Sequence, residues 1–324
     1  MKKIIIAIVS VLVIAFTCMS FVACKDPVVD TSGIEGFGDE KPTQESATAI
    51  TADMSAIEML LAGVDNFYAA DYIASNATGS IVTEVLGVKF TQFVKSQSIR
   101  NGSADGDYTM FSNNLSGSIG SSVMKVYIWE ETSYTKEGVT EDIYFRSGLK
   151  KDLQVVTLDE EKGVYDMAFK EGKTFQPVEQ FNDIEKYQSA KAANPTKIWM
   201  YDIDENTYDA EKSTTVTDNE DGTYTFTIVA DPKLSTVEYT KQMMYMLESS
   251  GVTPDGFEFK EIKLTITIWD NGYIKSLNLT ESYLMQVAGF IDTTITLNSF
   301  RQFSYFDNEE GFTPADLTEM MFTK

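Results

Sequence analysis

The clearest pattern in the chain is a strict alternation of apolar and polar residues in its last third. In the first half of "EIKLTITIWDNGYIKSLNL" every second residue is apolar: Ile262, Leu264, Ile266 and Ile268 alternate with Lys263, Thr265 and Thr267. Successive side chains of a strand point to opposite faces, so this pattern predicts a half-buried strand. Asn271-Gly272 predicts the tight turn of a hairpin, whose second strand carries Leu277 and Leu279. A further strand repeats the alternation with Ile291, Thr293, Ile295 and Leu297.

The segment before this hairpin predicts a strand followed by a helix. "TYTFTIV" alternates threonine with Tyr224, Phe226 and Ile228. Asp231-Pro232 predicts the start of the helix, because proline is favoured at the first helical position. The helix then carries an apolar stripe of Tyr239, Met243, Met246 and Leu247. Such a stripe serves either ordinary core packing or a lid over a varied apolar ligand, because thioethers adapt to irregular partners.

The first half of the chain predicts one helix and then a series of strands. Ser55 and Glu58 have the spacing of a capping box, and an apolar stripe that includes Ile57 and Leu61 follows. From about residue 72 to 156, β-branched and aromatic runs are separated by turn signals such as Asn101-Gly102. Short connections of this kind favour antiparallel neighbours. A polar helix is predicted at 177–193 and a short terminal helix after Thr313-Pro314.

These elements predict an α+β fold. We expect a large antiparallel sheet, curled into a half-barrel, with two to three amphipathic helices on its concave face. A wide curled sheet leaves a hollow that its own side chains do not fill. The expected apolar lining of that hollow is Tyr239, Met243, Met246, Leu247, Ile57, Leu61, Phe226, Ile228, Ile266, Ile268, Leu277 and Leu279.

The start of the chain predicts export and a lipid anchor. Lys2 and Lys3 precede an apolar run that is too short for a spanning helix. Cys24 follows directly on Ala23, as in the lipobox of bacterial lipoproteins, and would carry diacylglycerol after cleavage. The alternative is an ordinary cleaved signal with an incidental cysteine. The predicted organisation is a signal peptide at 1–23, a flexible acidic tether at 24–50 and a single β-rich domain at 51–324.

The amino-acid composition then excludes several kinds of catalytic and metal-binding site. The chain has no histidine and no cysteine after Cys24, which excludes disulfides, Cys or His nucleophiles, and zinc sites built on Cys or His. The net charge of −23, or −25 once the leader removes Lys2 and Lys3, repels nucleic acid and anionic lipid headgroups. The only arginines are Arg100, Arg146 and Arg301, so bidentate anion clamps are few. The excess of lysine over arginine favours a Gram-positive host and the outer face of its cytoplasmic membrane. An outer membrane is the alternative.

Catalytic and metal motifs fail on inspection. Asp202, Asp204 and Asn206 match the first ligands of a calcium loop, but Thr207 stands where glycine is required and Ser213 where the bidentate glutamate belongs. Three Ser-x-x-Lys matches begin at Ser122, Ser133 and Ser147 without the companion motifs of penicillin-recognising enzymes. We therefore expect no enzyme, no cofactor and no metal.

The layout resembles the LolA/LppX-type superfamily of lipid and lipoprotein carriers, in its Gram-positive lipoprotein branch. The resemblance rests on the lipobox cysteine, the acidic tether, the leading helix, the meander and the segments "DGTYTFTIVADP" and "LTITIWDNGYIKSLNL". It implies an unclosed barrel whose hollow binds acyl chains beneath helices, and hence a membrane-anchored carrier of lipids or acylated molecules. The alternative is a non-catalytic structural or protein-binding lipoprotein with a solid core. That alternative predicts an exposed aromatic patch, for which Trp129, Trp199 and Trp269 are the residues to inspect.

Overall fold

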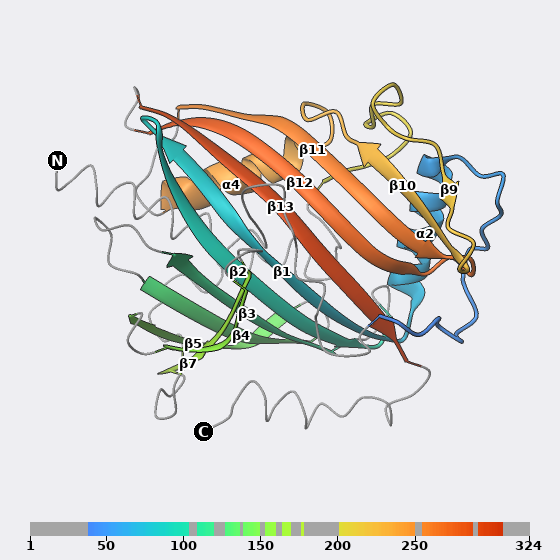
Figure 1. The fold of residues 1–324 in the computed structure, drawn as a ribbon, viewed down its shortest axis with the longest axis horizontal. Helices are drawn as coiled ribbons and strands as arrows, with labels where there is room; N and C mark the ends of the chain where they lie inside the picture. Colours follow the sequence, from blue (N-terminus) through green and yellow to red (C-terminus); the bar gives the residue numbers. More distant parts are fainter. Residues whose placement is uncertain are drawn as a thin grey trace.

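An open antiparallel sheet organises the protein in the computed structural model (Figure 1). The structure describes residues 38–103, 109–119, 127–136, 139–149, 153–159, 164–169, 176–177, 201–249, 255–287 and 291–306. Eleven strands follow the order β8-β5-β4-β3-β2-β1-β13-β12-β11-β10-β9. The strands at the two ends of this order do not pair with each other, so the sheet is not closed into a barrel.

The sheet consists of two meanders that meet at its centre. The first contains β1 (Tyr72–Val85), β2 (Val88–Asn101), β3 (Thr109–Ile119), β4 (Tyr127–Lys136), β5 (Val139–Leu149) and the edge strand β8 (Gln176–Pro177). The second contains β9 (Thr217–Asp218), β10 (Thr223–Val229), β11 (Asp255–Trp269), β12 (Ile274–Val287) and β13 (Ile291–Tyr305). They join where β1 pairs with β13, with Ile81 opposite Leu297. The predicted antiparallel neighbours are confirmed.

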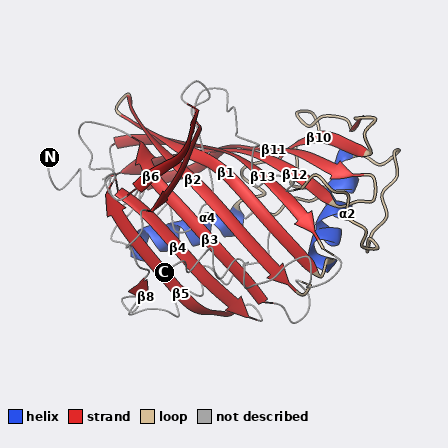
Figure 2. Ribbon diagram, turned by 60° about the horizontal axis from the view of Figure 1, so that its bottom comes forward, coloured by secondary structure: helices blue, strands red, loops and turns tan. Residues whose placement is uncertain are grey.

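Two helices lie on the same side of this sheet. Helix α2 (Ala56–Ala69) and helix α4 (Val237–Ser249) are both behind the strands in Figure 1 and in the turned view of Figure 2, where the sheet bends around them. The expected half-barrel with helices on its concave face is therefore confirmed. The helices predicted at 177–193 and after Thr313 lie outside the described residues.

Helix starts follow local hydrogen bonding. The capping box before α2 is confirmed: Ser55 N donates to Glu58 Oε2 at 2.8 Å, and Glu58 N donates to Ser55 Oγ at 3.4 Å. The predicted start of α4 at Pro232 is wrong. Asp231 instead caps a separate turn, because its Oδ1 accepts from the backbone N–H of Lys233 at 2.8 Å, and regular helix begins only at Val237.

One hairpin turn differs from the sequence prediction, and a second is formed by residues that the sequence analysis did not single out. The turn between β11 and β12 has three residues, since Trp269 N donates to Tyr273 O at 2.8 Å and Gly272 N donates to Trp269 O at 2.8 Å. Gly272 has φ +89°, the left-handed conformation that closes such a loop. The β1–β2 turn is Leu86-Gly87, with φ +52° and +77°, although leucine gives no turn signal. A separate two-stranded sheet, β6 (Leu153–Asp159) with β7 (Val164–Phe169), was also not fully predicted.

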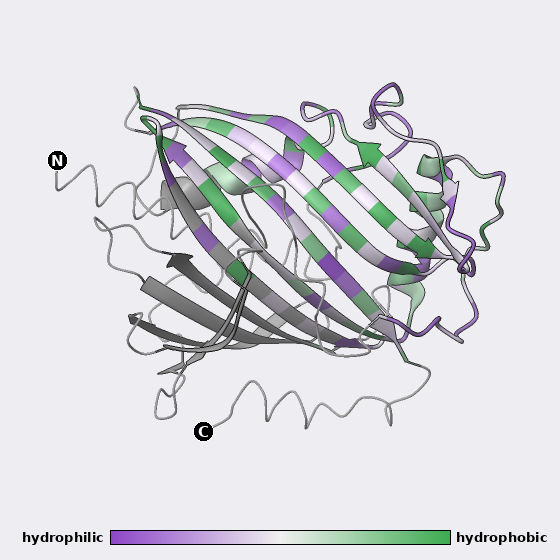
Figure 3. Ribbon diagram, viewed as in Figure 1, coloured by the Kyte–Doolittle hydropathy of each residue, from purple (hydrophilic) through white to green (hydrophobic). Residues whose placement is uncertain are grey.

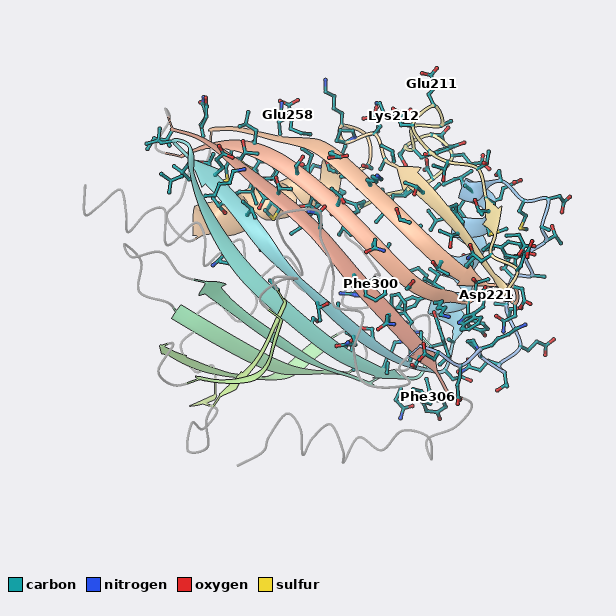
Figure 4. All side chains as sticks on the ribbon, in the orientation of Figure 1. Glu211, Lys212, Asp221, Glu258, Phe300 and Phe306 are labelled. Carbon is teal, nitrogen blue, oxygen red and sulfur yellow. The ribbon has the colours of Figure 1, made fainter. Side chains whose placement is uncertain are left out.

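The two faces of the second meander differ as the alternation predicts. We call the helix-covered face, which carries Ile266 and Tyr283, the inner face. Ile262, Leu264, Ile266 and Ile268 are all fully buried there. The outer face bears threonines that bond to each other across strands, such as Thr225 with Thr267 at 3.1 Å. Figure 3 shows this alternation as bands along β10–β13, and Figure 4 shows polar side chains such as Glu258 standing out from the outer surface.

The predicted flexible tether differs from the structure in its described part, residues 38–50. This segment lies against one end of the sheet through several hydrogen bonds. Gly38 N donates to Ser304 Oγ at 2.7 Å, and Asn271 Nδ2 donates to Pro42 O at 2.7 Å. Tyr273 Oη donates to Glu45 O at 3.1 Å. Residues 38–50 are thus part of the folded structure, whereas 24–37 lie outside the described residues.

The outer edge of β10 is closed by the loop that precedes β9. Thr214 N donates to Thr227 O at 2.8 Å and accepts from Thr227 N through its own Oγ1 at 2.8 Å. Both backbone groups of Val229 are also bonded. Asp209 N donates to its carbonyl oxygen at 2.7 Å, and its N–H donates to Ser213 Oγ at 3.0 Å. The backbone groups that a lone edge strand would leave open are therefore satisfied.

Candidate functional site

The residues predicted to line the hollow come together between the helices and the inner face. Ile57, Leu61, Phe226, Ile228, Tyr239, Met243, Ile266, Ile268, Leu277 and Leu279 belong to or pack against one apolar cluster. Helix α2 approaches closely, since a Cβ on Gly63 would stand only 2.8 Å from Cδ1 of Ile268. Met246 and Leu247 lie in α4, but their side chains are outside the described part of the structure.

Aromatic rings fill the space between α4 and the sheet. Tyr239 packs on Phe259 with ring centroids 5.2 Å apart, and on Tyr201 at 5.6 Å. Tyr283 in turn contacts Phe259 at 5.5 Å and Phe257 at 5.1 Å. Burial raises the pKa of Tyr239 and of Tyr283 well above the usual range of a phenol. This aromatic cluster joins α4 to β11 and β12 as a dry core.

Several predicted lining residues have no surface left to offer a ligand. Ile228, Ile266 and Ile268 are each 0 % exposed. A side chain beside a hollow large enough for a water molecule keeps some accessible surface even when the hollow is sealed from bulk solvent. The wall formed by β10 and β11 is therefore packed against its neighbours in this structure.

The inner face changes character where the two meanders meet. On β1, Ser75, Ala77 and Gly79 occupy successive inner positions, and Ser299 and Arg301 lie opposite Gly79 and Ala77 on β13. These small side chains occupy much less volume than the isoleucines of β11. Ser75 Oγ and Ser98 Oγ on β2 are 2.7 Å apart and form a hydrogen bond. We call Ser75, Ala77, Gly79 and Ser299 the small-residue patch; the long side chain of Arg301 adjoins it.

Arg301 is enclosed but not sealed. Burial lowers the pKa of its guanidinium to about 10, which leaves it charged at neutral pH. The residue nevertheless keeps accessible surface, in contrast to the fully buried isoleucines of the adjoining apolar wall. Across the strands it lies opposite Ala77 and Leu277.

Glu281 is an ionisable residue on the same inner face, and the sequence analysis missed it. It lies between Ile262 and Leu297 in the register and is 0 % exposed. Neither of its carboxyl oxygens has a hydrogen-bond partner among the described residues. Burial raises the pKa of this carboxyl well above its ordinary value, so its neutral form is favoured. The signal was present, because Glu281 continues the alternation of Leu277, Leu279 and Tyr283.

Two further polar residues hold α2 on the inner face. Arg100 of β2 donates through Nη2 to the carbonyl oxygens of Phe67 and Ala70, at 2.6 and 2.9 Å. Its guanidinium also stands over the Phe67 ring, 5.0 Å from the centroid. Asn66 accepts from Thr48 N at 2.7 Å and donates to Gly272 O at 3.0 Å. Two of the three arginines of the chain therefore lie on the inner face.

The calcium-like and Ser-x-x-Lys motifs form no metal or catalytic site among the described residues. Asp204 Oδ1 accepts from the backbone N–H groups of Asn206 and Thr207 at 2.7 and 3.0 Å, so the calcium-like loop is a turn. Among the described residues no group of three His, Cys, Asp or Glu could hold a metal ion. Ser133 and Lys136 both lie in β4, where residues three apart face opposite ways. The other two Ser-x-x-Lys pairs involve residues outside the described ranges.

Trp269, one of the three tryptophans considered for an exposed aromatic patch, does not contribute to one. Trp269 is buried, with the Lys275 ammonium 4.2 Å from its ring centroid. The side chain of Trp129 and all of Trp199 are outside the described residues. Cys24 is too, and the described helices include none that is long and apolar enough to cross a membrane.

Fold and site together define a class: an open antiparallel half-barrel with helices packed on its inner face. No known family profile matches the chain, and no curated protein is similar to it. Among solved structures, a DUF1329 family protein from Desulfovibrio piger has 10 % sequence identity over 81 % of this chain and 97 % of its own, with a TM-score of 0.25. A β-barrel-like protein of the domain of unknown function DUF1849 from Brucella abortus has 12 % identity over 74 % of this chain and 100 % of its own, with a TM-score of 0.21. At such scores neither likeness carries an argument about function.

Proposed function

We propose that this protein is a membrane-anchored, extracytoplasmic lipoprotein that binds a hydrophobic ligand, a lipid or an acylated molecule, in the curve of its sheet. The observation that carries the proposal is the small-residue patch beside the apolar wall. At Ala77, Gly79 and Ser299 the sheet contributes little side-chain volume. Gly79 and Arg301 keep accessible surface at the same place, whereas Ala77 and Ser299 are buried. A bent sheet with a large-residue wall and a small-residue centre favours a ligand at the centre.

The anchor is the second part of the proposal. Diacylglycerol on Cys24 would hold the chain to the outer face of the cytoplasmic membrane of a Gram-positive type of envelope. The acidic composition then keeps the folded part soluble above a negatively charged surface. The role is a non-catalytic one, since the sequence lacks histidine and recognisable nucleophile motifs. No nucleic acid is expected as a partner.

One preparation tests both parts. The full chain is expressed with its leader in a bacterial host, and its mass is measured under native and denaturing conditions. Acylation at Cys24 persists as covalent mass in both spectra, whereas a bound lipid appears only in the native one. The variant Cys24→Ser should lose the covalent mass and membrane retention. Absence of any non-covalent mass, together with no uptake of a fluorescent fatty acid, would count against the ligand-binding role.

A packed structural or protein-binding module is the second candidate. It is favoured by the complete burial of Ile228, Ile266 and Ile268, which leaves no ligand space at that wall. This alternative predicts that xenon or small apolar probes find no binding place on the inner face. Native spectra would then contain the acylated chain alone.

A further inference from the structure

The tip of the β1–β2 hairpin exposes two large apolar side chains. Leu86 is 79 % exposed and Val88 is 53 % exposed. A Cβ on Gly87 between them would meet no atom within 4 Å, so the tip projects into open space. The apolar character continues inward, because Val88 is opposite Val85, a buried member of the apolar cluster. The tip therefore extends the apolar inner face beyond the end of the sheet.

Leu86 occupies this tip at a conformational cost. Its φ is +52°, in the left-handed region that glycine and asparagine adopt easily and a branched side chain does not. Its exposure adds a second cost, because apolar surface is unfavourable in water. Backbone strain that is kept at an exposed apolar residue points to a role beyond the folding of the chain.

A lipid bilayer fits this tip better than a protein partner does. Two side chains offer far less than the surface of about 800 Å² per partner that a stable protein contact buries. The charge beside the tip is also balanced, because Lys89 Nζ lies 3.3 Å from Glu84 Oε2. A lysine next to apolar residues suits a membrane interface, where its stem lies in apolar surroundings and its ammonium reaches the headgroups. The tip thus reduces the repulsion that a net charge of −23 brings near anionic lipid.

The chain before the described residues is long enough for the tip to reach the bilayer that would hold Cys24. The tip and the start of the described chain lie at opposite ends of the sheet (Figure 1). Gly38 is bonded to Ser304, and Thr293 is opposite Val85 beside the tip, so eleven residues of β13 (304 − 293) separate the two ends by about 37 Å. Fourteen residues (38 − 24) lead from Cys24 to Gly38 and span at most about 46–50 Å.

We propose that Leu86, Gly87 and Val88 form a membrane-contact tip that enters the headgroup region of the bilayer in which Cys24 is anchored. This inference rests on the proposed function, because two side chains alone hold a protein too weakly: even one myristoyl chain gives only marginal binding. The anchor keeps the tip close to the lipid, so the second contact forms as an intramolecular step. The contact brings the end of the inner face to the lipid surface, where an amphiphilic ligand resides.

The test places a tryptophan reporter at the tip of the acylated chain. The full chain carrying Val88→Trp is purified with its acyl group and reconstituted into phosphatidylcholine vesicles, with and without bromine on the acyl chains. Neutral lipid is used because Asp292 is also exposed at this end of the sheet. Subtraction of the wild-type emission isolates the reporter from the three native tryptophans. We expect the added emission to shift to the blue on the vesicles and to be largely lost with brominated lipid.

Two variants separate a contact at the tip from general exposure and from unfolding. Leu234→Trp is the matched control, because Leu234 is 54 % exposed but lies in the turn before α4, and its emission should be the same with both lipids. Leu86→Asn added to Val88→Trp should reduce the quenching. Thermal unfolding should show that this chain is at least as stable as Val88→Trp alone, so unfolding cannot cause the reduction.

The outcomes distinguish the tip from the anchor. If the acylated chain is on the vesicles and Val88→Trp is quenched no more than Leu234→Trp, the membrane-contact tip is overturned and the proposed function stands. Quenching that Leu86→Asn leaves unchanged would overturn the role of Leu86 in the contact. A chain without acyl mass at Cys24 would overturn the anchor in the proposed function, and the membrane-contact tip with it.

Discussion

Arg100 donates from Nη2 to the carbonyl oxygen of Phe67, 2.6 Å away, and so a residue of β2 caps the end of α2. The helix has no basic residue in its own last turn, and the carbonyl groups there have no partner within the helix. We expect Arg100→Met to lower the free energy of unfolding by about 2–4 kcal/mol, since the charged donor is lost and the carbonyl oxygens of Phe67 and Ala70 stay buried without it. Urea unfolding measures this. Lys89→Met, which removes an exposed cation from the same strand, should change stability by less than about 1 kcal/mol. Equal effects of the two would contradict the capping role.

Asn66 joins the N-terminal segment to α2, and its removal should release that segment first. Asn66→Ala loses the bonds to Thr48 and Gly272, and we expect faster proteolysis at Lys41 as well as a loss of about 2–3 kcal/mol in stability. Asp65→Asn is the matched control, because Asp65 accepts only an exposed bond from Thr48 Oγ1 at 3.3 Å. If both variants are cut at the wild-type rate, residues 38–50 are held by other contacts.

Gly272 and Gly87 have similar backbone angles but different surroundings. A Cβ on Gly272 would overlap Nδ2 of Asn66 and approach Thr48 O to 3.2 Å, whereas one on Gly87 would meet nothing within 4 Å. Both have positive φ, which costs a non-glycine residue about 1–2 kcal/mol. Gly87→Ala should therefore lose about that amount, and Gly272→Ala clearly more. Thermal unfolding of the two variants measures the difference. A smaller loss of stability in Gly272→Ala than in Gly87→Ala would contradict the close approach at Gly272.

Leu86 is 79 % exposed and has φ +52°, an unfavourable combination for a leucine. Asparagine tolerates this conformation well, so Leu86→Asn should raise stability by about 1 kcal/mol. Leu234→Asn, at an exposed leucine without positive φ, should have little effect. Stabilisation of similar size at both sites would point to lost hydrophobic exposure as the cause.

Glu281 should make stability depend on pH in a defined direction. Its pKa is raised on folding, so the folded chain binds a proton that the unfolded chain releases above its ordinary pKa of 4.5. The free energy of unfolding should therefore fall as pH rises above 4.5 toward the raised pKa, by at most about 1.4 kcal/mol per pH unit. Glu281→Gln should remove this contribution, and Glu281→Leu should be more stable than wild type at pH 7. The exposed Glu205→Gln makes the same substitution at the surface and should keep the wild-type slope. An unchanged slope in Glu281→Gln would rule Glu281 out as its source.

The alternation of the sequence predicted the sheet well and its polar centre poorly. Ile262 to Ile268 gave the correct face because burial there follows a period of two. Glu281 follows the same period, but a carboxylate is expected outside, so its place on the inner face was not recognised. Arg100 was counted only as one of few arginines, since its role depends on carbonyl oxygens thirty or more residues away. Residues 38–50 have no periodicity because they dock largely through backbone groups, which composition does not reveal.

The loop that satisfies Thr227 and Val229 has a consequence for assembly. Unclosed sheets invite other chains to add strands, and from there to grow into fibrils. Here the protein's own loop from Asp209 to Thr214 bonds to the edge of β10. Another chain therefore cannot add a strand at this edge, although the sheet is not closed into a barrel. The half-barrel can in this way stay open without exposing the backbone groups of β10 to pairing with another chain.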